Sequence, residues 1–268
     1  MRYFIRLSYN GGAFCGWQIQ ENANSVQHEL QKALSTLFKE PVAVTGAGRT
    51  DTGVNAKNYI AHFDTANNIS PGTTTVYKLN AILPKEICVH EIYPVPNEMH
   101  ARFSAQSRTY KYYIHTEKDP FGSAFSYFIP PRKLNFEKMN QAAAYLLGEQ
   151  DFTSLEKLNG GSKTSICNVT EAYWEPIDAP DFAHATHFVF TVKANRFLRN
   201  MVRAMVGSLL EVGSGKREPE WIKEMLAQKS RCAAGHSVPG NALFFVGIEY
   251  PEPHRLDVKG DGPSVSDK

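Results

Sequence analysis

Apolar side chains occupy every second position along residues 2–9, which predicts a half-buried strand. Along residues 24–38 the apolar residues recur three and four positions apart, which predicts a helix that Asn24 or Ser25 caps. The same two periods predict further strands at residues 41–48, 58–65 and 86–95 and a short helix at residues 73–83. This order, βαββαβ, is that of one compact split-βαβ unit.

The second part of the chain repeats the order without obvious sequence identity. Its predicted elements are strands at residues 108–116, 165–177, 186–195 and 242–250 and helices at residues 135–148 and 197–212. An additional helix at residues 218–228 begins with Pro219, a residue that suits the first turn of a helix. We therefore expect an α+β protein with two domains of similar topology, residues 1–104 and 105–251, followed by a flexible tail at residues 252–268.

Composition narrows the class of protein further. The 268 residues are 42% hydrophobic, which is ordinary for a globular protein, and no apolar run is long enough to span a bilayer. The four cysteines lie apart and form no C-x-x-C pair, so we expect reduced thiols in a cytoplasmic protein. The nine histidines form no H-E-x-x-H motif, which argues against a metal-dependent hydrolase. We expect no metal, no cofactor and no membrane contact.

The net charge of +2 is too small to identify a nucleic-acid-binding protein, but the basic residues are clustered. They gather in two stretches of the sequence, at Arg102, Arg108 and Lys111 and at Lys193, Arg196, Arg199 and Arg203. In the first stretch, Tyr110 and Tyr112 are interleaved with the cations on one predicted strand. Such a strand suits a nucleobase that stacks on a ring beside bound phosphates, although tyrosines that only fill a sheet face give the same pattern.

The segment GAGRTDTG places Arg49 and Asp51 after a predicted strand, where loops present functional groups. Residues two apart in an extended backbone project to the same side, so both side chains can face one cleft. The glycines at this point, Gly46, Gly48 and Gly53, would let the backbone approach a bound partner closely. The spacing is not that of a phosphate-binding loop, and the central acid would repel phosphate. Two interpretations remain: a functional carboxylate, or an Asp-Thr-Gly turn in which Asp51 only caps its own backbone.

The predicted helix at residues 197–212 carries Arg203 among apolar residues that would otherwise be buried. A buried guanidinium requires an anion, whereas an arginine on a helix surface can extend its charged end to the solvent. Arg196, Arg199 and Arg203 would lie on one helix face, with Arg203 next to a carboxylate and the other two next to phosphates. The sequence leaves both interpretations of Arg203 open.

These motifs together resemble the tRNA pseudouridine synthases of the TruA type, over nearly the whole chain. The matching segments, in the order of that family, are YNGGAFCGWQIQ, SVQHELQKAL, GAGRTDTGVNA, LNAILP, HARFSAQSRTYKYYI, LLGEQDFTSL and NRFLRNMVRAMVGSLLEVG. The chain departs from the family pattern at Asn10, where Asp is usual, at Asn55, where His is usual, and in the loop at residues 233–240. The departures leave the reaction intact and concern the substrate contacts around Asn55 and that loop.

The resemblance implies an α+β fold of two ferredoxin-like (βαββαβ) domains, with sheets flanking a central basic cleft. It also implies a homodimer that modifies uridines in the anticodon stem-loop of tRNA, without a metal or organic cofactor. Asp51 would be the catalytic aspartate, Arg203 would pair with it, and Tyr110 would pack against the flipped uracil. Arg49 would help to displace the base. The cations that complete the expected substrate-binding set are Arg108, Lys111, Arg196 and Arg199.

Pseudouridine formation suits these residue types. The reaction breaks the bond between ribose C1′ and uracil N1, turns the base and rejoins it through C5. An ionised Asp51 could attack C1′ or C6, or act mainly as an acid and base, and a nearby arginine would favour its charged form. Extrusion of the base costs about a few kcal/mol, which Arg49 in the gap and Tyr110 against the base would offset. A non-catalytic RNA-binding protein is the alternative, but it leaves an acid among cations unexplained.

Overall fold

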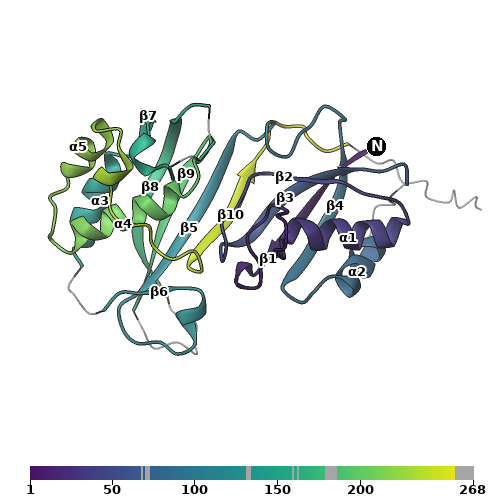
Figure 1. Ribbon diagram of the computed structural model, residues 1–268, viewed down its shortest axis with the longest axis horizontal. Coiled ribbons are helices and arrows are strands. Elements are labelled where there is room, and N and C mark those ends of the chain that lie inside the picture. The colour runs from purple at the N-terminus through teal and green to yellow at the C-terminus, as the bar shows by residue number, and fades with distance from the viewer. Residues whose placement is uncertain are drawn as a thin grey trace, which may run out of the picture.

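The computed structural model describes residues 1–67, 69, 73–130, 134–158, 160–161, 163–178 and 186–256 (Figure 1). Its first elements are β1 (Arg2–Tyr9), α1 (Val26–Phe38), β2 (Val44–Gly46), β3 (Asn55–Asp64), α2 (Thr73–Ile82) and β4 (Ile87–Val95). The elements that follow are β5 (Ser107–His115), β6 (Tyr127–Phe128), α3 (Phe136–Ala144), β7 (Gly148–Asp151), β8 (Ile166–Ile177), β9 (His187–Ala194), α4 (Met201–Gly213), α5 (Trp221–Ala227) and β10 (Leu243–Glu249). Every element predicted from the sequence is present, and the short strands β6 and β7 are additional.

Local signals set the ends of α1 and α5. Ser25 is the N-cap of α1, and its hydroxyl accepts the N–H of His28 at 3.3 Å. Of the two capping candidates, Ser25 is therefore the one confirmed. The prediction that Pro219 occupies the first turn of α5 is wrong, because that helix begins at Trp221 and Glu220 is its N-cap. The carbonyl of Pro219 instead accepts the N–H of Ile222 at 3.2 Å, in the turn that leads into the helix.

The described strands form one continuous sheet, in the order β4-β1-β3-β10-β5-β9-β8-β7, with β2 paired to β3 and β6 to β5. The mixed α+β class is thus confirmed, but the strands make one sheet where two were expected. β10, drawn in yellow in Figure 1, lies parallel to β3 on one side and antiparallel to β5 on the other. Pairing with β10 satisfies backbone groups of both neighbours, which would be costly to bury unpaired. The alternation of apolar residues shows which side chains of a strand face the core, but it does not show which other strand pairs with that strand.

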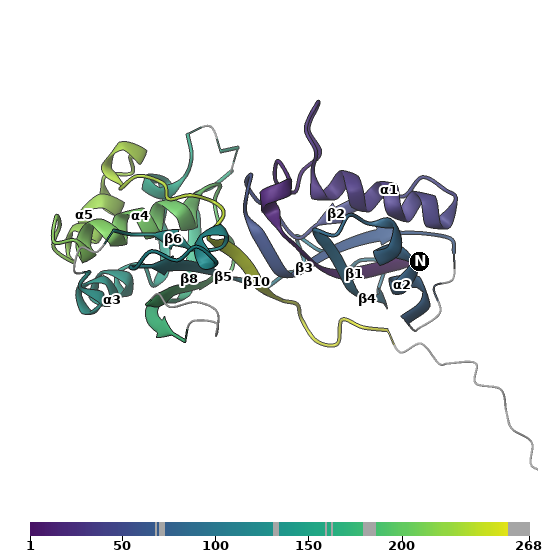
Figure 2. The ribbon, with the colours of Figure 1, turned by 90° about the horizontal axis from the view of Figure 1, so that it is seen from below.

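Two groups of helices cover the two ends of this sheet (Figure 2). Helices α1 and α2 pack with β1 and β3 around Leu30, Ile5 and other buried apolar side chains. Helices α3, α4 and α5 pack with β5, β8 and β9 around a second buried cluster, which includes Phe190 and Met205. Tyr110 of β5 packs against both clusters. The middle of the sheet is therefore the place where the two parts of the core meet.

The segment after β10 returns to the sheet edge formed by β4. Arg255 pairs with Glu91, with Nη1 and Oε1 2.5 Å apart, and its guanidinium lies 3.9 Å from the ring centre of Tyr93. The N–H of Leu256 donates to the carbonyl of Pro94 at 3.1 Å. Residues 252–256 of the segment expected to be a flexible tail thus contact β4, and the remainder, residues 257–268, lies outside the described residues.

Candidate active site

Asp51 lies in the loop between β2 and β3, with its side chain 27% exposed. Its main-chain carbonyl accepts the N–H of Val54 at 3.1 Å, and Gly53 adopts a φ of +79°, so the backbone itself closes the turn. The preceding residue, Thr50, is buried, and its carbonyl accepts the N–H of Trp17 at 3.2 Å. The backbone is thus fixed on both sides of Asp51, and its carboxylate is available for contacts outside the loop.

The carboxylate of Asp51 contacts two arginines from the other part of the chain. Arg203 Nη1 lies 3.4 Å from Oδ2, and Arg199 Nε lies 3.8 Å from Oδ1. The predicted contact between Arg203 and Asp51 is therefore confirmed, across 152 positions of sequence. Each carboxylate oxygen faces a separate cation, which holds the carboxyl group in a defined orientation.

The loop at residues 233–240 holds Arg203 in place. Arg203 Nε donates to the carbonyl of Val238 at 2.6 Å, and the N–H of Val238 donates to the carbonyl of Arg203 at 3.3 Å. The guanidinium thus has two partners, a neutral carbonyl and the carboxylate of Asp51, and its side chain is only 23% exposed. The interpretation in which Arg203 merely extends to solvent does not fit this geometry.

The predicted helix face shared by Arg196, Arg199 and Arg203 is wrong. Helix α4 begins at Met201, so Arg196 and Arg199 lie in the preceding loop. Asn200 ends that loop with a φ of 67°, a left-handed conformation that asparagine tolerates better than most residues. The turn brings Arg199 to the carboxylate of Asp51, where the sequence pattern had placed it beside phosphates.

Tyr110 stands beside this ion pair on β5. Its ring makes edge-to-face contacts with Phe197 and Phe245, at centroid distances of 5.0 and 5.3 Å. Burial raises the pKa of its hydroxyl, which nearby Arg108 lowers and nearby Asp51 raises. Tyr110 therefore presents a neutral, fixed aromatic ring at the site.

The other predicted site residues lie in different surroundings. Arg49 is exposed, and its Nε donates to Gln18 Oε1 at 3.3 Å. Arg108 donates to the backbone carbonyls of its neighbours, including Asn195 at 2.7 Å. Lys111 projects from the opposite face of β5 to Tyr110, with its Nζ 4.0 Å from a carboxylate oxygen of β8. The structure thus gathers Asp51, Arg199, Arg203 and Tyr110 and leaves Lys111 away from them. The substrate contacts of Arg49, Arg108, Lys111 and Arg196 stay predictions.

The glycines of the loop serve the protein more than a ligand. A Cβ on Gly46 would collide with the side chains of Trp17 and Tyr59. Gly53 is required by its positive φ. Only Gly48 would leave its Cβ in open space, with nothing within 4 Å. The expectation that all three glycines admit a partner is therefore wrong for Gly46, which is needed for packing against the aromatic core.

Asn55 is the structural residue that the sequence failed to assign. It is 1% exposed, and its Oδ1 accepts the N–H of Gly11 at 2.9 Å while its Nδ2 donates to the carbonyl of Asn241 at 2.7 Å. The side chain therefore joins the loop after β1 and the loop before β10 to the loop that carries Asp51. The departure from His at this position was visible in the sequence, but these partners lie 44 and 186 positions away.

Three further observations concern metal ligands, membrane-spanning helices and cysteines. No group of three or more His, Cys, Asp and Glu side chains gathers in the described part of the chain in a way that could hold a metal ion. No helix within that part is long and apolar enough to cross a membrane. The four cysteines are free thiols, and only Cys167 is buried.

Comparisons with known proteins agree on one family. Residues 142–251 match the family model described as tRNA pseudouridine synthase. The chain is 49% identical to a tRNA pseudouridine synthase A of Parabacteroides distasonis, over 94% of this chain and 96% of that protein. It is likewise 49% identical to the enzyme of that name from Bacteroides thetaiotaomicron, over 94% of this chain and 91% of the relative. A relative of the same name from Colwellia psychrerythraea is 39% identical over 98% of this chain and 99% of its own length. Identity at this level, over nearly the full length of each protein, shows that the chain belongs to the tRNA pseudouridine synthase A family.

Proposed function

We propose that this protein is a tRNA pseudouridine synthase that isomerises uridine in the anticodon stem-loop of tRNA, with Asp51 as its catalytic carboxylate. The observation that carries the proposal is the contact of Asp51 with Arg203 and Arg199, 3.4 and 3.8 Å away, at the junction of the two parts of the core. A protein that only binds RNA gains nothing from a carboxylate in this position, since it repels phosphate. A family of enzymes named for this reaction accounts for it.

The reaction requires one carboxylate and no co-reactant. The C1′–N1 bond breaks, the base turns, a C1′–C5 bond forms, C5 loses its proton and N1 gains one. Asp51 can attack carbon as a nucleophile or move these protons, and in both routes its oxygens must point at the nucleotide. Arg203, fixed by the carbonyl of Val238, orients the carboxylate for either route. It is therefore a positioning residue.

The surrounding residues suit an extruded base. Tyr110 offers a ring that its neighbours Phe197 and Phe245 prevent from turning away. Arg49 is exposed in the loop of Asp51, two positions before it, where it can occupy the space that the base vacates. Arg196 and Arg199 lie in the segment that precedes α4. Arg199 contacts Asp51 and its side chain is still 52% exposed, so both arginines can meet phosphates of the stem-loop.

Resemblance to the family supports a proposal for the domains, the compartment and the oligomeric state. We propose two ferredoxin-like halves, residues 1–104 and 105–251, that share one sheet through β10 and border a basic cleft at Asp51. The order of elements in each half, with α1 and α2 in one and α3 and α4 in the other, supports this division. We further propose a cytoplasmic homodimer in which each tRNA touches both subunits. The exposed free thiols of Cys15, Cys88 and Cys232 suit a reducing compartment.

Asp51→Asn tests the function. The variant should fold and bind tRNA like the wild type but release no tritium from tRNA labelled at uridine C5, because an amide cannot replace the carboxylate. Asp64→Asn is the matched control, since Asp64 also pairs with an arginine, Arg2, at 2.8 Å, but at the far end of β3. The control should keep its turnover. Tritium release by Asp51→Asn at the wild-type rate would refute the mechanism, and tRNA binding by a wild type that releases none would favour the RNA-binding alternative.

A further inference from the structure

The turn between β4 and β5 presents an aromatic side chain to solvent. Phe103 is 75% exposed, whereas most large apolar side chains of this chain are buried. Leaving a phenylalanine exposed forgoes most of the roughly 1.5–3 kcal/mol that its burial provides. The motif that contains it, HARFSAQ, is part of the family resemblance, yet nothing in the proposed reaction uses Phe103 or the adjacent Arg102.

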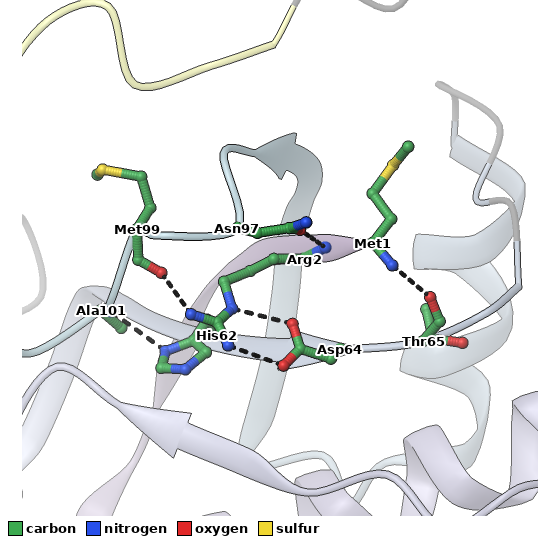
Figure 3. Close-up of polar contacts among 8 residues, drawn as sticks. All are labelled: Met1, Arg2, His62, Asp64, Thr65, Asn97, Met99 and Ala101. Carbon is green, nitrogen blue, oxygen red and sulfur yellow. Dashed lines mark hydrogen bonds and ion pairs between the residues drawn. The ribbon is translucent and has the colours of Figure 1, made fainter.

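Side chains hold the backbone of this turn rigid. The N–H of Ala101 donates to His62 Nδ1 at 3.1 Å, a contact drawn in Figure 3. His100 Nδ1 accepts the N–H groups of both Arg102 and Phe103, at 3.0 and 3.2 Å. Burial lowers the pKa of His62 to about 4, and burial also lowers the pKa of His100, so both rings stay neutral and can accept these bonds.

Arg2 of β1 and Tyr250, which directly follows β10, form further hydrogen bonds with the backbone of the same turn. The carbonyl of Ala101 accepts the hydroxyl of Tyr250 at 2.7 Å. Figure 3 shows the second contact, in which the guanidinium of Arg2 donates to the carbonyl of Met99 at 3.0 Å. A loop that only connects two strands does not require this many side-chain contacts. The conformation of Phe103 is thus fixed before any partner arrives, which lowers the entropy that binding costs.

The chemistry around the Phe103 ring is that of a nucleotide contact. The ring of His100 supports it at a centroid distance of 4.4 Å, and the guanidinium of Arg102 lies 5.5 Å from its centre. Arg102 is itself exposed. An exposed ring beside a cation offers a base a surface on which to stack and offers the adjoining phosphate a counter-charge. A protein surface would match the ring but would gain less from the cation.

Arg108 places this turn next to the candidate active site. Its guanidinium donates to the carbonyl of Arg102, to that of Asn195 at 2.7 Å and to that of Ala47 at 3.5 Å. Ala47 begins the loop of Arg49 and Asp51, and Asn195 directly precedes the segment of Arg196 and Arg199. One half-buried cation thus joins the turn to both segments that carry the proposed tRNA contacts.

We infer that Phe103 and Arg102 form a further contact for the tRNA, in which a nucleobase outside the reaction centre stacks on Phe103 and its phosphate meets Arg102. The inference rests on the proposed function for the identity of the RNA. It assigns Phe103 to substrate affinity and not to the chemical step, because the ring contacts His100 and Arg102 of its own turn and is not part of the Asp51 ion pair.

The test compares Phe103→Ala with Tyr77→Ala, using full-length protein and unmodified tRNA. Tyr77 is a matched control because it is also an aromatic residue with 75% exposure, but it lies on α2. Phe103→Ala should weaken tRNA binding roughly 5- to 150-fold, the equivalent of one stacked base, and Tyr77→Ala should not. The turnover number at saturating tRNA should stay at the wild-type value, because the lost contact contributes equally before and during the reaction.

Salt dependence separates the two residues. Arg102→Gln should reduce the slope of log affinity against log salt by about one, whereas Phe103→Ala should lower affinity at every salt concentration and keep the slope. Phe103→Trp should retain binding, and Phe103→Leu should not.

Several results would overturn the inference. The first is wild-type tRNA affinity in Phe103→Ala, and the second is wild-type affinity in Phe103→Leu. The third is a slope of log affinity against log salt that falls in Phe103→Ala as it does in Arg102→Gln, which would mean that the turn had collapsed. Sedimentation of the protein without RNA tests the other occupant: if Phe103→Ala dissociates a dimer, the ring contacts a second copy. These outcomes are distinct from failure of the proposed function, because affinity is measured without turnover and that failure is the absence of tritium release by the wild type.

Discussion

Replacement of Asn55 by alanine should destabilise the fold around the candidate active site. Asn55 begins β3, four positions after Asp51, and is 1% exposed. Alanine would leave the N–H of Gly11 and the carbonyl of Asn241 without their partner, at positions now bonded at 2.9 and 2.7 Å. Both groups belong to loops that border the loop of Asp51.

The expected loss follows from the burial of these two groups. Gly11 is buried, so its unpaired N–H should cost about 1–3 kcal/mol. Asn241 is half-exposed, so water can replace part of the bond to its carbonyl, and about 0.5–1.5 kcal/mol should be lost there. The free energy of unfolding should therefore fall by roughly 2–4 kcal/mol. This is a large share of the 5–15 kcal/mol that is typical of folded proteins.

Urea unfolding of Asn55→Ala beside Asn58→Ala measures this loss. Asn58 is three positions further along β3 and its amide also makes two bonds, to Arg6 at 3.3 Å and to the carbonyl of Val246 at 3.0 Å, but it is exposed. The control should lose less than about 1 kcal/mol, because water replaces exposed bonds. Equal losses in the two variants, or a loss below about 0.5 kcal/mol in Asn55→Ala, would show that Asn55 does not tie the loops together.

Two more perturbations test the Asp51 ion pair and the turn between β4 and β5. Arg203→Met should lower kcat about 10²-fold or more, because Asp51 would be misplaced. Arg203→Lys should have an intermediate kcat, because lysine keeps the charge but not the bond to Val238. A full rate in the methionine variant would show that the ion pair is not required. Folding lowers the pKa of buried His62 from 6.5 to about 4. As the pH falls, His62 therefore gains its proton in the unfolded state before it does so in the folded state. The free energy of unfolding should be at its full value above about pH 6.5 and fall by roughly 3 kcal/mol towards pH 4. Urea midpoints across this range should be flatter in His62→Asn, and an identical pH profile would contradict the assignment.

Local patterns in the sequence were sufficient to predict the elements and to single out Arg203, whereas its pairing with Asp51 was implied only by the family resemblance. Ser25 was a candidate cap because a hydroxyl before an amphipathic run can accept the free N–H groups of a helix start, and it does so in α1. Arg203 was conspicuous because a guanidinium among apolar residues needs an anion, and Asp51 supplies one. Both inferences depend on the cost of leaving a polar group without a partner, which is visible in a single segment.

Features that depend on distant segments were not predictable in this way. The left-handed Asn200 moves the start of α4 past Arg199, and its side chain is held at 2.5 Å by Ser237, 37 positions later. Lys111 alternates with Tyr110 along β5, so the two cannot share a face, although their chemistry had grouped them. Arg255 was assigned to a free tail because its partner Glu91 lies 164 positions earlier. Asn200 and Arg255 are placed by contacts with residues that no sequence window contains together. The alternation of Lys111 and Tyr110, in contrast, is local and was visible in the sequence.

The position of β10 explains why the candidate site needs both parts of the chain. β10 pairs with β5 along its length but with β3 only at Phe244 and Phe245, so the backbone alone joins the two parts of the sheet weakly. Side chains supply the rest of the connection: the buried ring of Phe245 packs against Tyr110, and Asn55 binds the loop that leads into β10. Asp51 comes from one side of this junction and Arg203 from the other, so the carboxylate acquires its partner only when the last strand has paired. The geometry of the candidate site is therefore a property of the junction, and we expect neither part of the chain to assemble it alone.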